Sequence, residues 1–209
     1  MNFLSVKKKI IAQAAEAKIF LINNKIVKSR ISKGYRLPFL DKKLRKQRTR
    51  KEAKLLQKAA SLIPVPRILA VNETQSTIEL EYVKGKKLSE SLDTLPIEKA
   101  LNICKLIGTQ MATLHDAGII HGDLTTSNMI FAKEQLYIFD FGLGFESYKT
   151  EDRAVDLHLI KEAFEARHFA RATAYLRAMI EGYKKSGKAR ETLRRLANVE
   201  KRGRYKQQF

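Results

Sequence analysis

The chain has 209 residues, 44% of them hydrophobic, so it is long enough for one domain with a substantial core or for two small lobes that share one. This hydrophobic fraction excludes a wholly disordered chain, and no apolar run reaches the roughly 20 residues that span a membrane. The single cysteine, Cys104, excludes an internal disulfide framework and a cysteine-cluster zinc site. Charged residues interrupt the N-terminal segment, which lacks the apolar stretch of a signal peptide, so we expect a cytoplasmic protein.

The charge is strongly positive and unevenly distributed. Forty-one lysines and arginines against 22 acidic residues give a formal net charge of +19 at pH 7. Two runs, at 42–54 and 188–209, carry much of the excess. A polyanion such as RNA or DNA is the first candidate partner. A basic proteome or a hot habitat is the alternative explanation for such an excess of surface lysine and arginine.

The first predicted element is a β-hairpin in the segment 10–31. Apolar side chains cluster on both sides of the dipeptide Asn23-Asn24, and two consecutive asparagines are typical of a tight turn. This pattern places Lys28 on the second strand of the hairpin.

A helix and a second pair of strands are predicted next. Asp41 is a favourable N-cap for a helix that runs to about Ala60, and two closely spaced prolines then end it. The segments 67–71 and 76–83 are predicted to be strands joined by a polar turn.

The C-terminal half is predicted to be mainly helical. Gly85 and the polar residues after it mark a boundary between two lobes, at 1–84 and 85–209. A long helix is expected over about 97–117, then a short strand pair within 128–140, then helical sequence again. The apolar residues of the long helix recur every three to four positions: Ile97, Leu101, Cys104, Ile107, Met111 and Leu114. The predicted fold class is therefore α+β, with a strand-rich lobe containing one main helix and a reduced, mainly helical lobe across a cleft.

Two short motifs carry the candidate chemistry: HGDLTTSN at 121–128 and FDFG at 139–142. Asp123 and Asn128 lie five residues apart in a loop after the long helix, and Asp140 ends an apolar strand 17 residues beyond Asp123. Phosphoryl transfer requires a group that positions the incoming hydroxyl, oxygen ligands for Mg²⁺, and a cation on the phosphates. A loop asparagine and a strand-end aspartate provide the hard oxygen atoms that Mg²⁺ prefers. The predicted hairpin between them returns the chain to the same edge of the cleft.

The four histidines and the cysteine are predicted to be structural. His121 is expected to hold the loop by packing and hydrogen bonding rather than to catalyse. His115, His158 and His168 lack the spacing of metal ligands and are expected at the surface or in packing contacts. Cys104 is expected to be a small core residue of the long helix.

Together the two motifs resemble the catalytic loop and the metal-binding motif of the protein-kinase-like superfamily. By this resemblance Asp123 is the catalytic base, and Asn128 and Asp140 are the Mg²⁺ ligands. Lys28 is then the strand lysine that contacts the ATP phosphates, with Glu52 as its partner on the helix. ATP and Mg²⁺ are the implied cofactors.

The same resemblance implies roles for residues outside the two motifs. Glu81 and Val83 fall where the hinge between the lobes presents backbone groups to adenine, and Asp156 falls where a helix aspartate supports the catalytic loop. Gly122 stands where ordinary protein kinases have arginine, so we do not expect control by a phosphorylated activation segment. No A-P-E motif follows Gly142, so the usual platform for peptide substrates is expected to be largely missing.

These departures are similar to those of the small atypical kinase of the KEOPS complex. The segments that carry this resemblance are VKSRISKGYRLPFLDKKLRKQRTRKEAKLL, HGDLTTSNMI, EDRAVDLHLI and the terminal RGRYK. The resemblance implies a serine/threonine kinase and ATPase that supports the installation of N6-threonylcarbamoyl on adenosine 37 of certain tRNAs. Its implied partners are the threonylcarbamoyl-transferase subunit and a small companion subunit. Ala14 stands where that family usually has glycine, and Glu16 in the same turn is carried over as a nucleotide-site residue.

The basic runs then have an implied partner in tRNA. The helix face near 42–54 and the C-terminal tail are both expected along tRNA phosphates, with Arg202, Arg204 and Lys206 as the RNA-binding residues of the tail. One alternative is a small-molecule phosphotransferase of the aminoglycoside or choline kinase type, which also uses an H-G-D loop but needs a larger helical region with an acidic pocket. Another alternative is an RNA-binding scaffold without catalysis.

Overall fold

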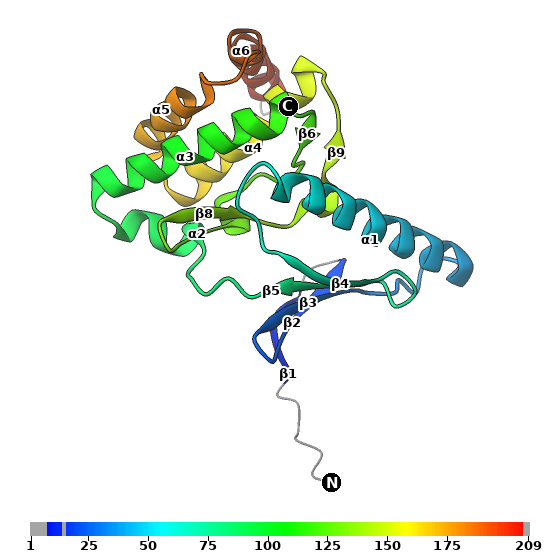
Figure 1. Cartoon of the computed structure of the whole chain (residues 1–209). Helices are drawn as coiled ribbons and strands as arrows, with labels where there is room; N and C mark the ends of the chain where they lie inside the picture. The colour runs from blue at the N-terminus through cyan, green and yellow to red at the C-terminus, as the bar shows by residue number, and fades with distance from the viewer. Residues whose placement is uncertain (1–7, 14–15, 207–209) are drawn as a thin grey trace.

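The computed structural model describes residues 8–13 and 16–206. It has two lobes, and the N-terminal one is built on a five-stranded antiparallel sheet with strand order β1-β2-β3-β5-β4 (Figure 1). Its strands are β1 (Lys8–Gln13), β2 (Ala17–Ile22), β3 (Lys25–Arg30), β4 (Ile68–Asn72) and β5 (Thr77–Glu81). In Figure 1 this sheet lies below α1 (Pro38–Ala60), and the helices of the second lobe lie above.

The predicted hairpin around Asn23 and Asn24 is confirmed as β2–β3. Both asparagines have positive φ, 47° and 60°, which matches the tight turn that twisted antiparallel strands favour. Lys28 lies on the second strand of this hairpin, opposite Ile19 of β2. The prediction missed one feature, because residues 10–13 belong to a third strand, β1, that pairs with β2 at the edge of the sheet. Strands β2 and β3 are six residues each, so the hairpin covers only Ala17–Arg30. The apolar residues Ile10 and Ile11 precede it and belong to β1.

Helix α1 begins earlier than predicted, and the prediction of Asp41 as its N-cap was wrong. The N-cap is Leu37, and a proline occupies the first turn, where its fixed φ is already helical. Asp41 is buried inside the first turn and accepts hydrogen bonds from Ser32 Oγ at 2.9 Å and Arg45 Nε at 2.7 Å. Its carboxylate therefore ties the preceding loop to the helix instead of capping it.

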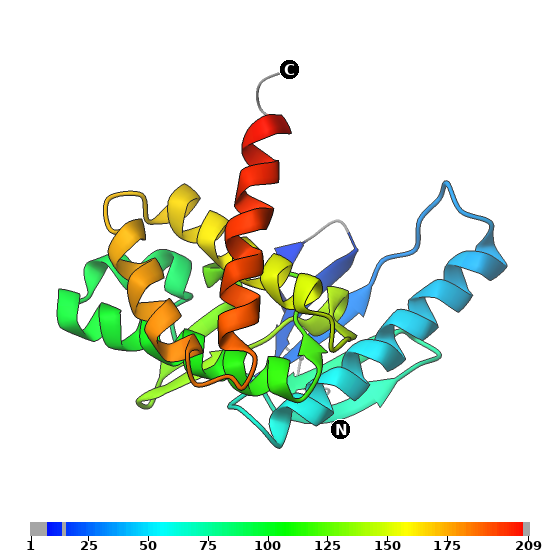
Figure 2. The same cartoon turned by 90° about the horizontal axis from the view of Figure 1, so that it is seen from above.

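The second lobe is mainly helical and carries two short strand pairs. Its helices are α2 (Leu88–Ser91), α3 (Ile97–Asp116), α4 (Thr150–Arg167), α5 (Ala172–Tyr183) and α6 (Ala189–Lys206). Its strands are β6 (Ile119–Ile120), β7 (Met129–Ala132), β8 (Gln135–Ile138) and β9 (Phe145–Glu146), with short 3₁₀ helices η1 (Leu92–Thr94), η2 (Thr126–Asn128) and η3 (Phe141–Leu143). Figure 2 shows α6 running past the other helices, with the C-terminus beyond its far end.

Helices α3 and α5 form the tightest contact of this lobe. A Cβ atom on Gly108 of α3 would lie 1.8 Å from the carbonyl oxygen of Met179, and one on Gly182 of α5 would lie 2.0 Å from that of Lys105. The two helices therefore touch backbone to backbone, which a side chain at either glycine would prevent. The predicted helix over 97–117 is confirmed.

The core of the second lobe confirms most of the predicted apolar face of α3. Cys104 is fully buried, as predicted, and burial raises the pKa of its thiol to about 12. Ile97 is an exception, because it is 44% exposed in the first turn, where α3 extends beyond the core. His115 and His168 are buried, and His158 is partly buried on α4.

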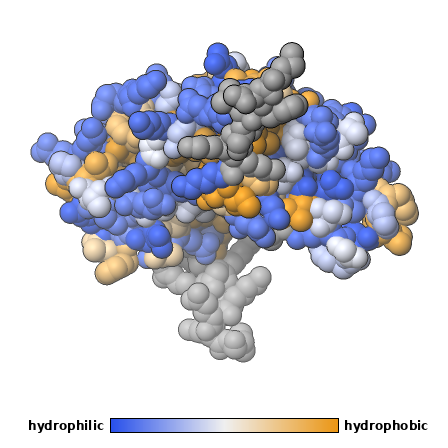
Figure 3. Space-filling view, turned by 90° about the horizontal axis from the view of Figure 1, so that it is seen from below, coloured by the Kyte–Doolittle hydropathy of each residue, from blue (hydrophilic) through white to orange (hydrophobic). Residues whose placement is uncertain are grey.

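The outer surface is mostly polar. Figure 3 shows hydrophilic residues over most of the face seen from below, with apolar residues gathered in small groups. Within the described residues, none of the helices is both long and apolar enough to cross a membrane.

Candidate active site

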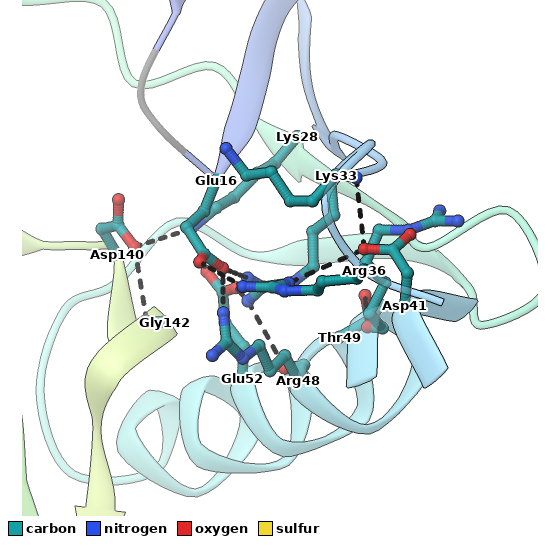
Figure 4. A network of polar contacts seen from close by, with 12 residues as sticks. Glu16, Lys28, Lys33, Arg36, Asp41, Arg48, Thr49, Glu52, Asp140 and Gly142 are labelled. Carbon is teal, nitrogen blue, oxygen red and sulfur yellow. Dashed lines mark hydrogen bonds and ion pairs between the residues drawn. The ribbon is translucent and has the colours of Figure 1, made fainter. Parts of the chain in front are cut away.

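The centre of the site is Lys28, which lies between two carboxylates from different parts of the fold. Its Nζ atom is 2.6 Å from Oε1 of Glu52 on α1 and 2.6 Å from Oδ1 of Asp140, just after β8 (Figure 4). The side chains of Lys28 and Glu52 are 10% and 4% exposed. These contacts link the sheet, α1 and the second lobe at one point.

The charges of this group reinforce one another. Burial alone lowers the pKa of Lys28, but the carboxylates of Glu52 and Asp140 more than compensate and raise it above its ordinary value. Burial alone raises the pKa of Asp140, but the adjacent Lys28 ammonium brings it below its ordinary value. Lys28 and Asp140 are therefore both charged at neutral pH.

Arg30 is a site residue that the sequence analysis missed. Its Nη2 atom donates to Oε2 of Glu52 at 2.5 Å, so each oxygen of that carboxylate binds one buried cation. Residues two apart on a strand share a face, so Arg30 points the same way as Lys28. The K-x-R spacing on a predicted strand is the signal that would have identified it.

Glu16 lies next to this group in an arginine cluster (Figure 4). Arg48 of α1 donates a hydrogen bond to its carboxylate, and Arg36 and Arg30 lie 3.6 and 4.0 Å from it. The hydrogen bond from Arg48 lowers the pKa of Glu16, and the neighbouring arginine charges add to this effect. Glu16 is thereby tied to α1, while Ala14 lies outside the described residues.

The HGDLTTSN loop, the predicted catalytic loop, brings Asp123 and Asn128 together. Nδ2 of Asn128 donates to both the backbone oxygen and Oδ2 of Asp123, each at 2.9 Å. The backbone oxygen of Asn128 accepts from the N–H of Phe139 at 3.0 Å. This last bond crosses the base of the β7–β8 hairpin, so Asn128 and Asp140 lie at the same edge, as the sequence predicted.

His121 holds this loop in the way that the sequence analysis expected. Its Nε2 atom lies 3.0 Å from the carbonyl oxygen of Phe139, and its Nδ1 atom accepts from the N–H of Asp123 at 3.3 Å. A carbonyl only accepts and a backbone N–H only donates, so the ring is a neutral imidazole with its proton on Nε2. The ring also packs on Phe141, with centroids 4.7 Å apart.

Asp156 anchors the start of the loop from α4. Its two oxygens accept from the backbone N–H groups of His121 and Gly122, both at 2.8 Å, and His115 Nε2 lies 3.2 Å away. Burial alone would raise the pKa of Asp156, but the hydrogen bonds from His115 and from the loop bring it below its ordinary value. Gly122 has φ +75°, and a Cβ there would lie 2.6 Å from the backbone oxygen of Leu143. No residue with a side chain fits this position without strain.

The oxygen ligands available here fit Mg²⁺. Asp140 has a left-handed backbone, φ 68°, and its Oδ1 accepts from the N–H of Gly142 at 3.3 Å as well as from Lys28. The described part of the chain contains no cluster of three or more His, Cys, Asp or Glu side chains that could hold a metal alone. Mg²⁺ in phosphoryl-transfer sites takes one or two protein oxygens and fills its shell with water and phosphate, so Asn128 and Asp140 suffice.

The remaining predicted site residues lie in two places, the link between the lobes and the end of α6. Glu81 is the last residue of β5 and Val83 follows it on the segment that joins the lobes. Arg202, Arg204 and Lys206 lie in the last turns of α6, where the backbone is helical and the side chains are outside the description.

Comparison with known proteins matches this architecture to kinases. Residues 21–175 match the family model of the protein kinase domain. The crystal structure of the Rio2 kinase from Chaetomium thermophilum, in its ADP/Mg²⁺-phosphoaspartate complex, superposes with a TM-score of 0.64 at 18% identity. That match covers 96% of this chain and 72% of the Rio2 chain, and it establishes the shared fold.

Sequence relatives narrow the family. The KEOPS complex subunit Bud32 of Pyrococcus abyssi is 40% identical over 95% of this chain and 97% of its own length. The probable serine/threonine-protein kinase BUD32 homolog of Archaeoglobus fulgidus is 37% identical over 91% and 93%. A probable bifunctional tRNA threonylcarbamoyladenosine biosynthesis protein of Methanobrevibacter smithii is 37% identical, and the match spans 98% of this chain but only 38% of that protein. The chain belongs to the Bud32 family of KEOPS complex kinase subunits.

Proposed function

We propose that this chain is a Mg²⁺- and ATP-dependent serine/threonine kinase and ATPase, acting as the Bud32 subunit of a KEOPS complex in the biosynthesis of N6-threonylcarbamoyladenosine on tRNA. The observation that carries the catalytic part is the position of Lys28, 2.6 Å from both Glu52 and Asp140. A buried lysine held between a helix carboxylate and a metal-ligand carboxylate is what positioning of ATP phosphates requires.

Each side chain of the site is then assigned one role in phosphoryl transfer. Lys28 binds the phosphates, and Glu52 keeps its ammonium in place. Asn128 and Asp140 hold Mg²⁺, which when bound neutralises charge on the phosphates. Asn128 uses its amide nitrogen on Asp123, so its Oδ1 atom is the one assigned to the metal. Asp123 orients the incoming hydroxyl or water and accepts its proton.

The adenine end of the nucleotide is assigned to the link between the lobes. We place the N-terminal lobe at 1–84 and the C-terminal lobe at 85–209, with Glu81 and Val83 presenting backbone groups to adenine. Glu16 then lies beside the phosphates, where its arginine contacts support the turn over the nucleotide.

The partners follow from the family. The Methanobrevibacter relative carries a region like this chain in about two-fifths of a longer protein, which supports a threonylcarbamoyl-transferase subunit as the principal partner. The small companion subunit and tRNA complete the assembly in the cytoplasm. Arg202, Arg204 and Lys206 are assigned to tRNA phosphates, since they belong to the basic sequence at the end of α6.

Two other functions are less well supported. A small-molecule phosphotransferase would need a larger C-terminal region with an acidic pocket, whereas the described residues after Gly142 form three helices, of which the last, α6, is strongly basic. A non-catalytic scaffold would have no use for the buried Lys28–Glu52 pair, which is costly to assemble without a ligand.

Loss of ATP turnover in two variants tests the catalytic assignment. We expect Asp123→Ala and Asp140→Ala to abolish ATP hydrolysis while the melting temperature stays close to that of the wild type. Glu134→Ala, at an exposed carboxylate of the β7–β8 turn, is the control and should hydrolyse ATP normally. Wild-type rates in both site variants would reject the assignment.

Removal of the tail tests the RNA assignment separately. A chain lacking 202–209 should bind tRNA more weakly and show a smaller dependence of affinity on salt, because fewer phosphates are neutralised. Its affinity for ATP should not change. Equal tRNA affinity with and without the tail would remove Arg202, Arg204 and Lys206 from the RNA surface.

A further inference from the structure

A second chain of polar contacts reaches the catalytic loop at Thr126. Thr126 opens the 3₁₀ helix η2, and its Oγ1 atom lies 3.1 Å from Nε2 of His168, the residue after α4. Nδ1 of His168 lies 2.7 Å from Oδ2 of Asp93 in η1. Thr126 and His168 are 1% and 2% exposed, so the contact between them is screened from water.

The order of donors along this chain follows from the chemistry of its members. The Asp93 carboxylate only accepts, so it fixes the proton of the imidazole on Nδ1. In the neutral ring, Nε2 then accepts the hydroxyl proton of Thr126. The other oxygen of Asp93 accepts from Tyr175 Oη on α5 at 2.9 Å. Each polar atom of the imidazole therefore has one partner.

Packing prevents the imidazole from turning away. The ring of His168 lies edge-on to the rings of Phe164 and Tyr175, with centroids 6.2 and 5.9 Å away. Arg171 adds hydrogen bonds to the backbone oxygens of Asp93 and Leu95. The chain thus joins η1, the end of α4 and the start of α5 to the middle of the catalytic loop.

The residue that this chain fixes is adjacent to the reacting groups. Thr126 is the first residue of η2 and Asn128 is the last, and the amide of Asn128 sets the position of the Asp123 carboxylate. Asp156 fixes the beginning of the same loop through the N–H groups of His121 and Gly122. Hydrogen bonds therefore hold the loop at two points, just before Asp123 and just before Asn128.

We propose that Thr126, His168 and Asp93 are positioning residues that hold Asn128 and Asp123 in register for phosphoryl transfer. The proposal rests on the proposed function, because it requires a reaction to be positioned. A hydroxyl, an imidazole and a carboxylate in this order also resemble a nucleophile triad, but the burial of Thr126 keeps its hydroxyl away from any substrate.

Two substitutions at Thr126 separate the hydroxyl from the shape of the side chain. Thr126→Val keeps the volume and removes the donor to His168, whereas Thr126→Ser keeps the donor. Loss of partners behind a metal ligand costs about tenfold or more in activity or metal affinity. We therefore expect Thr126→Val to lower kcat for ATP hydrolysis about tenfold and to raise the Mg²⁺ concentration for half-maximal rate, while the Kd for ATP measured without Mg²⁺ changes less than about twofold. Thr126→Ser should stay within about twofold of the wild type.

Asp93→Asn tests the same positioning role at the far end of the chain of contacts, one residue beyond His168. The side chain of Asp93 is 45% exposed, so the substitution leaves the core intact and only weakens the hold on the imidazole. We expect a smaller decrease in kcat in the same direction, again with a raised Mg²⁺ requirement. Melting temperatures of all variants show what fraction is folded under the assay conditions.

The outcomes separate this proposal from the function on which it rests. Wild-type turnover with unchanged kcat and Mg²⁺ dependence in Thr126→Val and Asp93→Asn would overturn the positioning role alone. A Thr126→Ser variant as slow as Thr126→Val would also overturn it, because the hydroxyl would then not be the operative group. A wild-type chain that does not hydrolyse ATP, alone or with its partners and tRNA, would reject the proposed function and the positioning role together.

Discussion

The Nζ atom of Lys28 lies 2.6 Å from Oε1 of Glu52, and this contact joins β3 to the inner face of α1. The pair is almost fully buried, so the orientation of α1 sets the position of Lys28, the proposed phosphate-binding residue. Arg30 binds the other oxygen of the same carboxylate, so Glu52 is the anion that these two buried cations of one strand share.

Glu52→Gln should therefore destabilise the fold strongly. The amide removes the charge that Lys28 and Arg30 share, and breaking a buried ion pair by removing one partner costs about 3–5 kcal/mol. Urea unfolding at neutral pH measures this difference. Glu79→Gln is the matched control on the same sheet, because Glu79 pairs with Lys25 in an exposed ion pair and should cost less than about 1 kcal/mol. Equal losses in the two variants would show that the buried pair does not contribute in this way.

Acid should weaken the fold through Asp156. The pKa of this carboxyl is below its ordinary value in the folded chain, so the unfolded chain binds its proton more readily. Its contribution is complete above the unfolded pKa of about 3.9 and is lost as the pH falls through the lower, folded pKa. Asp156→Asn should cost about 1.5–3 kcal/mol of unfolding free energy at pH 7, and this difference from the wild type should shrink below pH of about 4.

Chemical unfolding at several pH values checks this expectation. Asp152→Asn, on the same helix, removes a carboxylate that accepts a hydrogen bond from the loop residue Ser147 and serves as the control. A deficit of Asp156→Asn that stays constant from pH 7 to 3 would contradict the assignment of the acid-sensitive group.

Gly182→Ala should disrupt the contact between α3 and α5. The added methyl group would lie 2.0 Å from the carbonyl oxygen of Lys105, which is backbone and cannot rotate away. Overpacking of this kind costs about 1–3 kcal/mol or more, and thermal unfolding would report it as a lower Tm. Gly187→Ala is the control, because nothing lies within 4 Å of a Cβ at that position. A Gly182→Ala variant with the Tm of the Gly187→Ala control would mean that the helices separate without cost.

Local patterns in the sequence were sufficient for the elements that carry the chemistry. The asparagine turn, the periodicity of α3 and the spacing from Asp123 to Asp140 are all short-range features, and the structure confirms the elements they predicted. The start of α1 was not predictable in the same way. Aspartate is a residue type that favours the N-cap position, but the carboxylate of Asp41 accepts hydrogen bonds from Ser32 and Arg45 instead of capping the helix.

Long-range polar contacts explain what the sequence did not reveal. His168 was expected only as a packing or surface residue, yet its partners Asp93 and Thr126 are 75 and 42 residues away. No periodicity connects residues at such separations, so only the fold brings them together. Arg30 differs, since its proximity to Lys28 on one strand made its role readable from spacing.

The hydrogen bonds from the Asn128 amide to Asp123 couple the position of the proposed base to that of the proposed metal ligand. The orientation of each side chain depends on the other, because the Asn128 amide donates to the Asp123 carboxylate. A substitution at one position therefore also releases the other, and the kinetic defect it causes contains both losses. The effects of substitutions at the two positions are not additive, and proton transfer and metal binding cannot be assigned to separate residues by single variants alone.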